Sequence, residues 1–295
     1  AASVTQNANK LTINQTTDKL ITNWSSFNIG SGAAVQFIQP SSTSSALNRV
    51  TSTDPTYIEG SLSANGRVIL INPSGVVFSN GARVDASGII TSTLNLSDQN
   101  YLNDQYVFEN NGLAGSINNA GTLRAFAGGV VALVAPQVIN TGTISADAGT
   151  AALLAGDKVT LTLNGNRLIK YTIDQGTLNG LLQNNGAIIA GEGVVILSAQ
   201  GLNAVSNSVV NNAGVIQATG ITQNGGQIFL DSDGTTVNSG KLDVSSSTQN
   251  GGQIQVTGNK VQIKSGSTLD ASGATGGGSI LIGGSWQNTD PTVRQ

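Results

Sequence analysis

The sequence predicts an all-β protein: a right-handed parallel β-helix with an N-terminal cap and a β-hairpin inserted outside the coils. Two observations support this fold class. The chain is rich in β-branched residues and in glycine, with 38 Gly among 295 residues, a composition that favours short strands and tight turns. It also repeats an Asn-x-Gly unit followed by alternating apolar residues, which indicates strands that each bury one face.

The Asn-x-Gly unit recurs between residues 119 and 240. It appears at Asn119-Ala-Gly121, Asn140-Thr-Gly142, Asn184-Asn-Gly186, Asn212-Ala-Gly214 and Asn238-Ser-Gly240. A single unit cannot bury its apolar face, so we expect the units to stack as coils of about 20 to 28 residues, the arrangement of a β-helix. The stacked asparagines are expected to hydrogen-bond along the rod and to adopt the left-handed conformation of a sharp corner.

Two segments interrupt this period, and the first 60 residues differ from the rest. Alternating runs flank Asn164-Gly165-Asn166, which predicts a β-hairpin outside the coils. The segment near 95–111 lacks the repeat and predicts a loop or short helix packed on the rod. An atypical N-terminal unit is expected to close the open end of a solenoid. We predict one domain over 1–295: a cap (1–60), first coils (61–157) with the insertion near 95–111, the hairpin insertion (158–174) and regular coils (175–295). The sequence after Gly284 predicts continuation into a longer parent protein.

The composition excludes several classes of function. Charged residues make up 10% of the chain and the net charge is −3, which is unlike a nucleic-acid-binding protein. The chain contains no His and no Cys, so it lacks the usual zinc, copper and haem ligands and the nucleophile–histidine pairs of many hydrolases. No apolar run is long enough for a membrane helix. We therefore expect a monomer with no catalytic residue, no metal, no cofactor and no nucleic-acid partner.

Two alternative functions remain open, and the first is a β-helical polysaccharide lyase or hydrolase. Asp231 and Asp233 would share one face of a strand, as do the paired acids of β-helical polysaccharide lyases and hydrolases. Gly234 follows directly and no third acid accompanies the pair, so a turn is the preferred interpretation. The second alternative is a glycan-binding adhesin module. Its candidate sugar-stacking aromatics are Tyr101, Tyr106, Tyr171 and Trp286.

Several motifs follow one another in a fixed order between Ile21 and Leu96. They are Trp24-Ser-Ser-Phe27, Val35-Gln-Phe37, Leu47-Asn48-Arg49-Val50, Ile58-Glu-Gly60 and Asn72-Pro73-Ser74-Gly75. In this order they resemble the haemagglutination-activity, or TPS (two-partner secretion), domain of the filamentous haemagglutinin and high-molecular-weight adhesin family. The resemblance continues more loosely through Ala127-Gly-Gly129 and Ala155-Gly156-Asp157. The family's Asn-Pro-Asn-Gly signature carries Ser74 here, and the second Asn-Pro-Asn-Leu motif of some members is not found.

The resemblance implies the N-terminal secretion domain of an exoprotein, with an adhesin as the expected parent. Such a domain leads the chain through the periplasm of a Gram-negative bacterium and is recognised by the POTRA domains of an outer-membrane TpsB transporter. It then nucleates β-helix folding at the cell surface, and a host-cell or polysaccharide receptor would be met through the parent protein. The resemblance assigns recognition and nucleation to Asn72, Pro73, Ser74, Gly75, Asn48 and Arg49.

The same residues also have a purely structural interpretation. Asn72 to Gly75 fits a type I turn, with Asn at the first position, Pro at the second and Gly at the fourth. Asn48 and Arg49 could fix the cap against the first coil. Sequence alone leaves both interpretations open.

Overall fold

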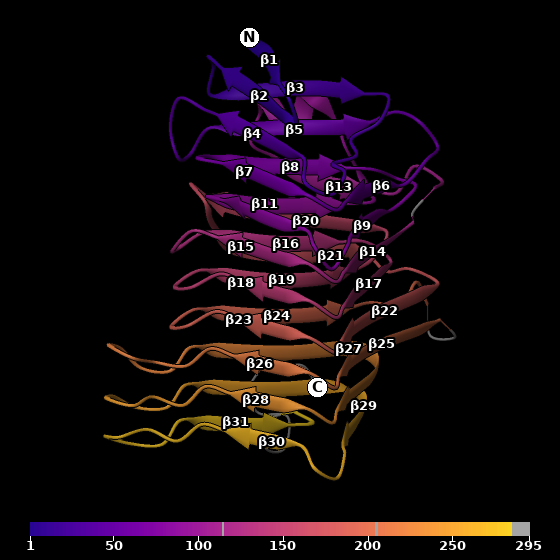
Figure 1. The fold of residues 1–295 in the computed structure, drawn as a ribbon. Coiled ribbons are helices and arrows are strands. Elements are labelled where there is room, and N and C mark those ends of the chain that lie inside the picture. The colour runs from indigo at the N-terminus through magenta and orange to yellow at the C-terminus, as the bar shows by residue number, and fades with distance from the viewer. Residues whose placement is uncertain (114, 204–205, 285–295) are drawn as a thin grey trace.

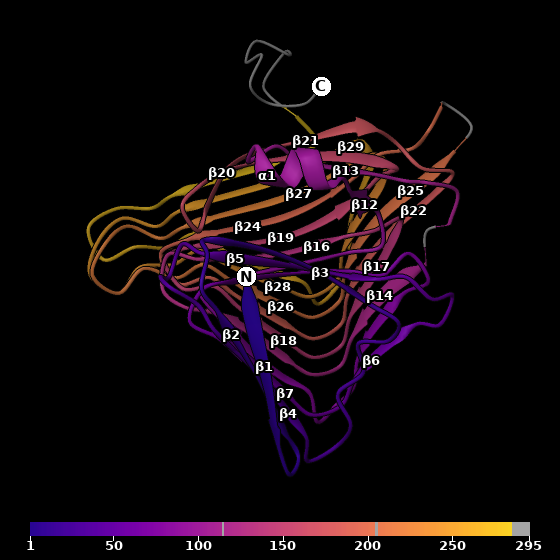
Figure 2. The ribbon, with the colours of Figure 1, turned by 90° about the horizontal axis from the view of Figure 1, so that it is seen from above.

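The computed structural model describes residues 1–113, 115–203 and 206–284, and these form a rod of stacked coils with three faces (Figures 1 and 2). Viewed from the N-terminal end, the chain passes clockwise from β18 to β19 to β22 as it recedes, so the β-helix is right-handed. The predicted fold class is therefore confirmed. The predicted features of the chain after Gly284, including Trp286, lie outside the described residues.

The first face is one sheet whose strands stack along the rod. In spatial order these are β1 (Ala2–Asn7), β2 (Lys10–Gln15), β4 (Ala34–Ile38), β7 (Ser61–Ala64), β10 (Arg83–Ala86), β15 (Thr122–Ala125), β18 (Thr143–Ser145), β23 (Ala187–Ile189), β26 (Val215–Gln217), β28 (Lys241–Asp243) and β30 (Thr268–Asp270). All neighbouring pairs are parallel except β1 and β2.

The other two faces share one hydrogen-bonded sheet, because β27 and β29 bend from one face onto the other. The second face contains β3 (Lys19–Trp24), β5 (Ser45–Val50), β8 (Arg67–Ile71), β11 (Gly88–Ser92), β16 (Val130–Val134), β19 (Thr150–Ala155), β24 (Val194–Ala199), the start of β27 (Gln227–Asn238) and of β29 (Gln253–Ile263), and β31 (Ser279–Ile282). The third face contains β6 (Thr56–Ile58), β9 (Val76–Phe78), β14 (Ser116–Asn119), β17 (Gln137–Asn140), β22 (Asn179–Asn184), β25 (Asn207–Asn212) and the ends of β27 and β29.

The core of the rod consists of columns of inward-facing apolar side chains. On the first face one column passes in register through Val84, Leu123, Ile144 and Ile188, all fully buried. The alternation read from the sequence produces these columns, since every second side chain of a strand points to the same face. Each coil buries its apolar residues only against its neighbours, as expected for a solenoid.

The N-terminal cap is shorter than predicted. β2 and β3 already stack in parallel on β4 and β5, so most of residues 1–60 forms coils, and only β1 pairs antiparallel. The aromatic residues that set this region apart close the coil from within. Phe27 is buried and meets Trp24 edge-to-face, with ring centroids 5.4 Å apart.

Both interruptions of the repeat leave the coil at the same corner and pair with each other. β12 (Asn95–Leu96) and β13 (Tyr106–Glu109) join β20 (Lys158–Asn164) and β21 (Arg167–Gln175) in an antiparallel sheet, with α1 (Asp98–Leu102) beside it. The predicted hairpin is confirmed, whereas the segment near 95–111 provides two strands besides a helix. We call β12, β13, β20 and β21 the extrahelical sheet.

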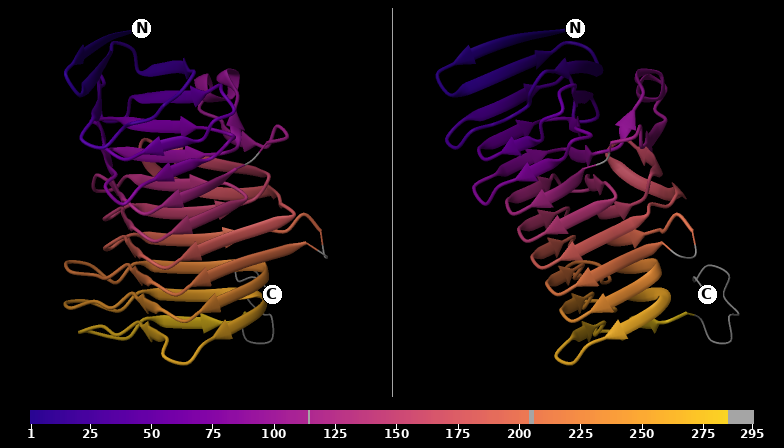
Figure 3. Two further views of the ribbon diagram at one scale, coloured as in Figure 1. Left: turned by 45° about the vertical axis from the view of Figure 1, so that its right-hand side comes forward. Right: turned by 90° about the vertical axis from the view of Figure 1, so that its right-hand side faces the viewer.

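The extrahelical sheet covers the outer side of the second face and creates a second core (Figures 2 and 3). Strands beneath it are buried on both sides, as in β16, where all five residues are inaccessible. Within the described residues α1 is the single helix, and no helix has the length and apolarity that a membrane span requires.

Candidate recognition site in the first coils

Asn72 to Gly75 forms the turn that the sequence predicts, between β8 and β9. The Gly75 N–H donates to the Asn72 carbonyl over 3.1 Å, closing a four-residue turn. The Ser74 N–H donates to Asn72 Oδ1 over 2.9 Å, so the asparagine side chain caps the turn as expected. Gly75 has a φ of +121°, a conformation that side-chain-bearing residues rarely adopt. Pro73 and Ser74 are half-buried.

The side chain of Asn72 is completely buried and fully engaged. Its Nδ2 donates to the Asp54 carbonyl and to Thr56 Oγ1, both over 3.0 Å. These contacts tie the turn to the strand of the preceding coil on the third face. In the folded protein a partner can therefore reach Pro73 and Ser74 but not the amide of Asn72.

Asn48 lies inside the stack of the second face. Its Oδ1 accepts from Thr22 Oγ1 over 2.9 Å and from Trp24 Nε1 over 3.0 Å, and its Nδ2 donates to the Ala46 carbonyl. The residue is inaccessible to solvent. Asn48 thus joins β5 to β3, and its Nδ2 also donates to the Ile69 carbonyl of β8 over 3.4 Å, so it links the predicted cap to the first coil after it.

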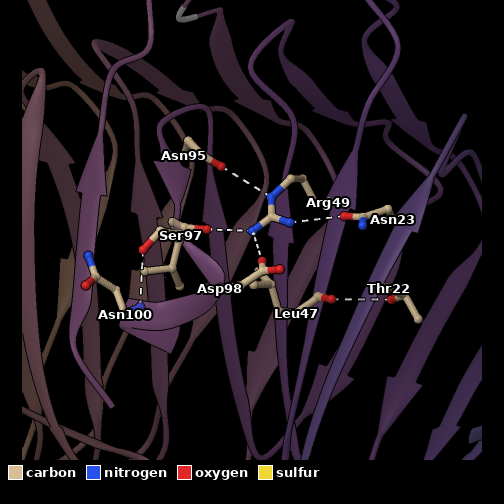
Figure 4. Close-up of polar contacts among 9 residues, drawn as sticks. Thr22, Asn23, Leu47, Arg49, Asn95, Ser97, Asp98 and Asn100 are labelled. Atoms are coloured by element: carbon tan, nitrogen blue, oxygen red, sulfur yellow. Dashed lines mark hydrogen bonds and ion pairs between the residues drawn. The ribbon is translucent and has the colours of Figure 1, made fainter. Parts of the chain in front are cut away.

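Arg49 joins the first coils to the first insertion (Figure 4). Its guanidinium donates to the Leu96 carbonyl over 2.6 Å, to Asn95 Oδ1 over 3.2 Å and to Asn23 Oδ1 over 3.0 Å. It also forms an ion pair of 2.8 Å with Asp98, at the start of α1. A planar guanidinium can donate to all of these acceptors at the same time, whereas the ammonium group of a lysine could not make the same set of contacts.

Replacing Arg49 with methionine is expected to lower the free energy of unfolding by about 1 to 3 kcal/mol, because several acceptors lose a charged donor. Urea denaturation measures this change, and hydrogen exchange over residues 95–102 should become faster. Asp98→Asn is the matched control, since it removes only an ion pair whose carboxylate is 56% exposed. We expect that control to cost less than about 0.5 kcal/mol. An equal loss in both variants would assign the effect to the ion pair instead.

A column of buried asparagines connects the later coils. Each Nδ2 donates to the Oδ1 of the next asparagine over 2.7 to 2.8 Å, in the order Asn119, Asn140, Asn184, Asn212, Asn238. The predicted ladder is confirmed. The predicted left-handed conformation is wrong: these asparagines end strands in extended backbone, and the positive-φ non-glycine residues described are Ala8, Asp104, Ala148 and Glu192.

The acid pair and the aromatic candidates have structural roles. Asp231 and Asp233 lie in a bulged part of β27, not in a turn. Asp231 accepts from Thr257 Oγ1 over 2.7 Å, while Asp233 accepts from the Gly201 N–H and from Ser208. The described residues contain no group of three or more acids that could hold a metal ion. The strand position explains the wrong turn prediction, since β27 continues through Gly234 as it bends.

Tyr101 and Tyr106 are buried, so the prediction of exposed sugar-stacking rings is wrong for both. They pack in the second core under the extrahelical sheet. Burial raises the pKa of Tyr101, and it raises the pKa of Tyr106 to about 12. Tyr171 is half-buried, and Trp286 lies outside the described residues.

Arg67 holds the two insertions in place on the rod, a role that the sequence did not reveal. It is 5% exposed, its guanidinium lies 5.2 Å from the Tyr106 ring centroid, and Nη1 donates to the Gly165 carbonyl over 3.0 Å. It therefore holds both insertions against β8. An arginine directly before the apolar run Val68–Ile71 was the signal that could have indicated this role.

Comparison with known proteins identifies the family. Residues 1–256 match the family model of the TPS secretion domain. The Heme/hemopexin-binding protein of Haemophilus influenzae strain Rd is 32% identical over 239 residues, covering 79% of this chain and 26% of that protein. A second Haemophilus influenzae Heme/hemopexin-binding protein is 30% identical over 247 residues, covering 77% and 26%. The chain thus spans about a quarter of the length of these relatives.

Solved structures agree with this assignment. The HMW1 secretion domain from Haemophilus influenzae has a TM-score of 0.68 and 26% identity, covering 92% of this chain and 82% of that one. The filamentous hemagglutinin secretion domain has a TM-score of 0.57 and 17% identity, covering 96% and 97%, and shows the shared fold. The chain therefore belongs to the TPS secretion domain family, whose members are secretion domains of proteins exported from Gram-negative bacteria.

Proposed function

We propose that this chain is the N-terminal secretion domain of an adhesin and that the POTRA domains of its TpsB transporter read the segment around Asn72–Gly75 before the domain folds. After passage through the periplasm, the domain folds at the cell surface and serves as the template for later coils. The observation that carries the proposal is the burial of Asn72, whose amide is inaccessible once the coil has closed.

The stacked architecture supports the template role. Each coil pairs in register with the coil before it, and the asparagine column extends this register from Asn119 to Asn238. In a solenoid each new unit requires only its neighbour, so folding can propagate from a completed seed.

The test compares two states of the chain. The purified chain is either folded or freshly diluted from urea, and its binding to the POTRA fragment of the cognate transporter is measured. We expect the freshly diluted chain to bind at least about tenfold more tightly, because binding before the coil closes leaves the Asn72 amide accessible. Equal binding by the folded chain would contradict recognition before folding.

Asn72→Ala and Asn119→Ala form the matched pair of variants for this test. Both remove a buried asparagine with several hydrogen bonds, so both should lower the free energy of unfolding by about 2 to 4 kcal/mol. We expect Asn72→Ala alone to weaken POTRA binding of the freshly diluted chain. The same POTRA affinity in both variants would assign Asn72 a structural role only.

A second candidate concerns the parent protein. The identity of 32% to a Heme/hemopexin-binding protein favours a parent that binds haem or hemopexin, as that name describes for the relative. An adhesin would instead contact a host-cell or polysaccharide receptor. Binding of the full-length parent to hemopexin, measured beside its adherence to epithelial cells, separates the two.

We also propose that the domain has no catalytic role. The carboxylates of Asp231 and Asp233 are occupied by contacts that hold the bend of β27, which supports structural use. New reducing ends or unsaturated sugars formed from acidic polysaccharides would contradict this proposal.

A further inference from the structure

The outer strand of the extrahelical sheet lies beside a groove on the rod. β21 pairs with β20 along one edge and, among the strands described, with none along the other. A groove of about 470 Å³ separates β21 from the outer sides of β24, β27 and β29. Its lining includes Leu168 and Lys170 of β21, and Ile196, Phe229 and Gln255 of the rod. Figure 3 shows the extrahelical sheet against the upper coils, with the coils of β27 and β29 below it.

The groove continues the interface between the extrahelical sheet and the rod. One column of outward side chains on the second face passes in register through Ala132, Ala152, Ile196, Phe229 and Gln255. The first three are at most 8% exposed beneath the sheet, whereas Phe229 is only half-buried and the next residue is polar. The apolar stripe is therefore one coil longer than the sheet that covers it.

We propose that this groove binds one extended polypeptide strand, which pairs with the outer edge of β21 and places an apolar side chain against Phe229. Main-chain hydrogen bonds to an edge strand supply affinity, and pockets for alternate side chains supply specificity. Adjacent strands lie about 4.8 Å apart, so one added strand would cover about one coil, which matches the uncovered stripe. Lys170 and Asp231 line the groove with opposite charges, so the groove has no strong preference for the charge of the bound strand. It favours a strand with apolar side chains at alternate positions.

This interaction is separate from transporter recognition. The groove is assembled from β21, β24, β27 and β29, so it exists only after the insertions and the later coils have folded. Its partner meets the folded domain, and the occupant is a segment of another polypeptide with apolar residues at alternate positions. If the groove binds no peptide, the proposed recognition by the transporter still stands, because peptide binding requires the folded chain and transporter recognition uses the chain before it folds.

A synthetic peptide with the sequence of residues 158–164 is the probe. These residues form β20, which pairs with the other edge of β21 and alternates Val159, Leu161 and Leu163. We expect saturable binding of the labelled peptide to the folded chain by fluorescence anisotropy, with slower hydrogen exchange in β21. Salt should have little effect, because the binding depends on main-chain and apolar contacts.

Phe229→Lys is expected to weaken peptide binding at least about tenfold, because it places a charge on the apolar floor. The matched control is Phe126→Lys, which changes a 42%-exposed aromatic outside this groove and should leave the affinity unchanged. Thermal melts confirm that both variants are folded before binding is measured.

Four results would overturn the proposal. One is no saturable binding up to about 1 mM peptide. Another is equal binding by a peptide N-methylated at alternate amides, which cannot pair with an edge. Faster exchange in β13 would show that the peptide displaces β20 instead. Self-association that the peptide inhibits would assign the groove to a second copy of the chain.

Discussion

Replacing Asn184 with alanine is expected to lower the free energy of unfolding by about 3 to 5 kcal/mol. Asn184 Nδ2 donates to Asn212 over 2.8 Å, and its Oδ1 accepts from Asn140 over 2.7 Å. The substitution removes both bonds and leaves a buried donor and a buried acceptor without these partners. Each such loss costs about 1 to 3 kcal/mol, which exceeds the small net value of the bonds themselves.

The measurement should resolve individual coils, because a solenoid need not unfold in one step. We expect the urea midpoint to fall and hydrogen exchange to increase in β22, which contains residue 184, and in β17 and β25, which pair with β22. Asn211→Ala is the matched control, since Asn211 is half-exposed on the outer side of the same face. It should cost less than about 0.5 kcal/mol. A similar loss in both variants would show that the column adds no stability.

The repeated part of the fold was predictable because its signal is local. The Asn-x-Gly unit marks the corner at the end of the third face, and the alternation after it fixes which side chains enter the core. The hairpin at Asn164-Gly165 was equally readable, and Gly165 has the positive φ that such a turn requires. The turn at Asn72 to Gly75 also followed from local residue preferences.

The pairing of the two insertions was not predictable from spacing. β13 and β20 are brought together only because both insertions leave the rod at one corner. No local sequence pattern indicates that the two insertions share this corner. A readable signal did exist in β16 and β19, whose consecutive apolar residues indicate burial on both sides. That burial would have placed Tyr101 and Tyr106 beneath a cover instead of in solvent.

The burial of Asn48 and Asn72 was also invisible in the sequence. An asparagine in a turn or strand is usually solvated, and only the stack supplies side-chain partners such as Thr22 and Thr56. The recognition assignments therefore rest on resemblance, while the structure supplies the stability role of the same residues.

Gly186→Ala is expected to be at least as damaging as Asn184→Ala. A Cβ at Gly186 would lie 2.1 Å from the carbonyl oxygen of Gly142 and 2.7 Å from the carbonyl carbon of Thr141. Both are backbone atoms held by strands on either side, so the coils must separate. We expect a loss of more than about 3 kcal/mol, beyond the usual cost of overpacking. Gly30→Ala is the control, since nothing lies within 4 Å of its Cβ position.

The two corner residues should act as one unit, and a double-mutant cycle tests this. Asn184 supplies the bond to the next coil, and Gly186 permits the approach that makes this bond possible. Once the coils have separated, the asparagine bond is already lost. The double variant Asn184→Ala/Gly186→Ala should therefore cost about 1 to 3 kcal/mol less than the sum of the single losses. The pair Asn184→Ala and Gly30→Ala is the control, because its two losses of unfolding free energy should simply add. If the losses at Asn184 and Gly186 also add, the asparagine ladder and the close approach of the coils contribute independently.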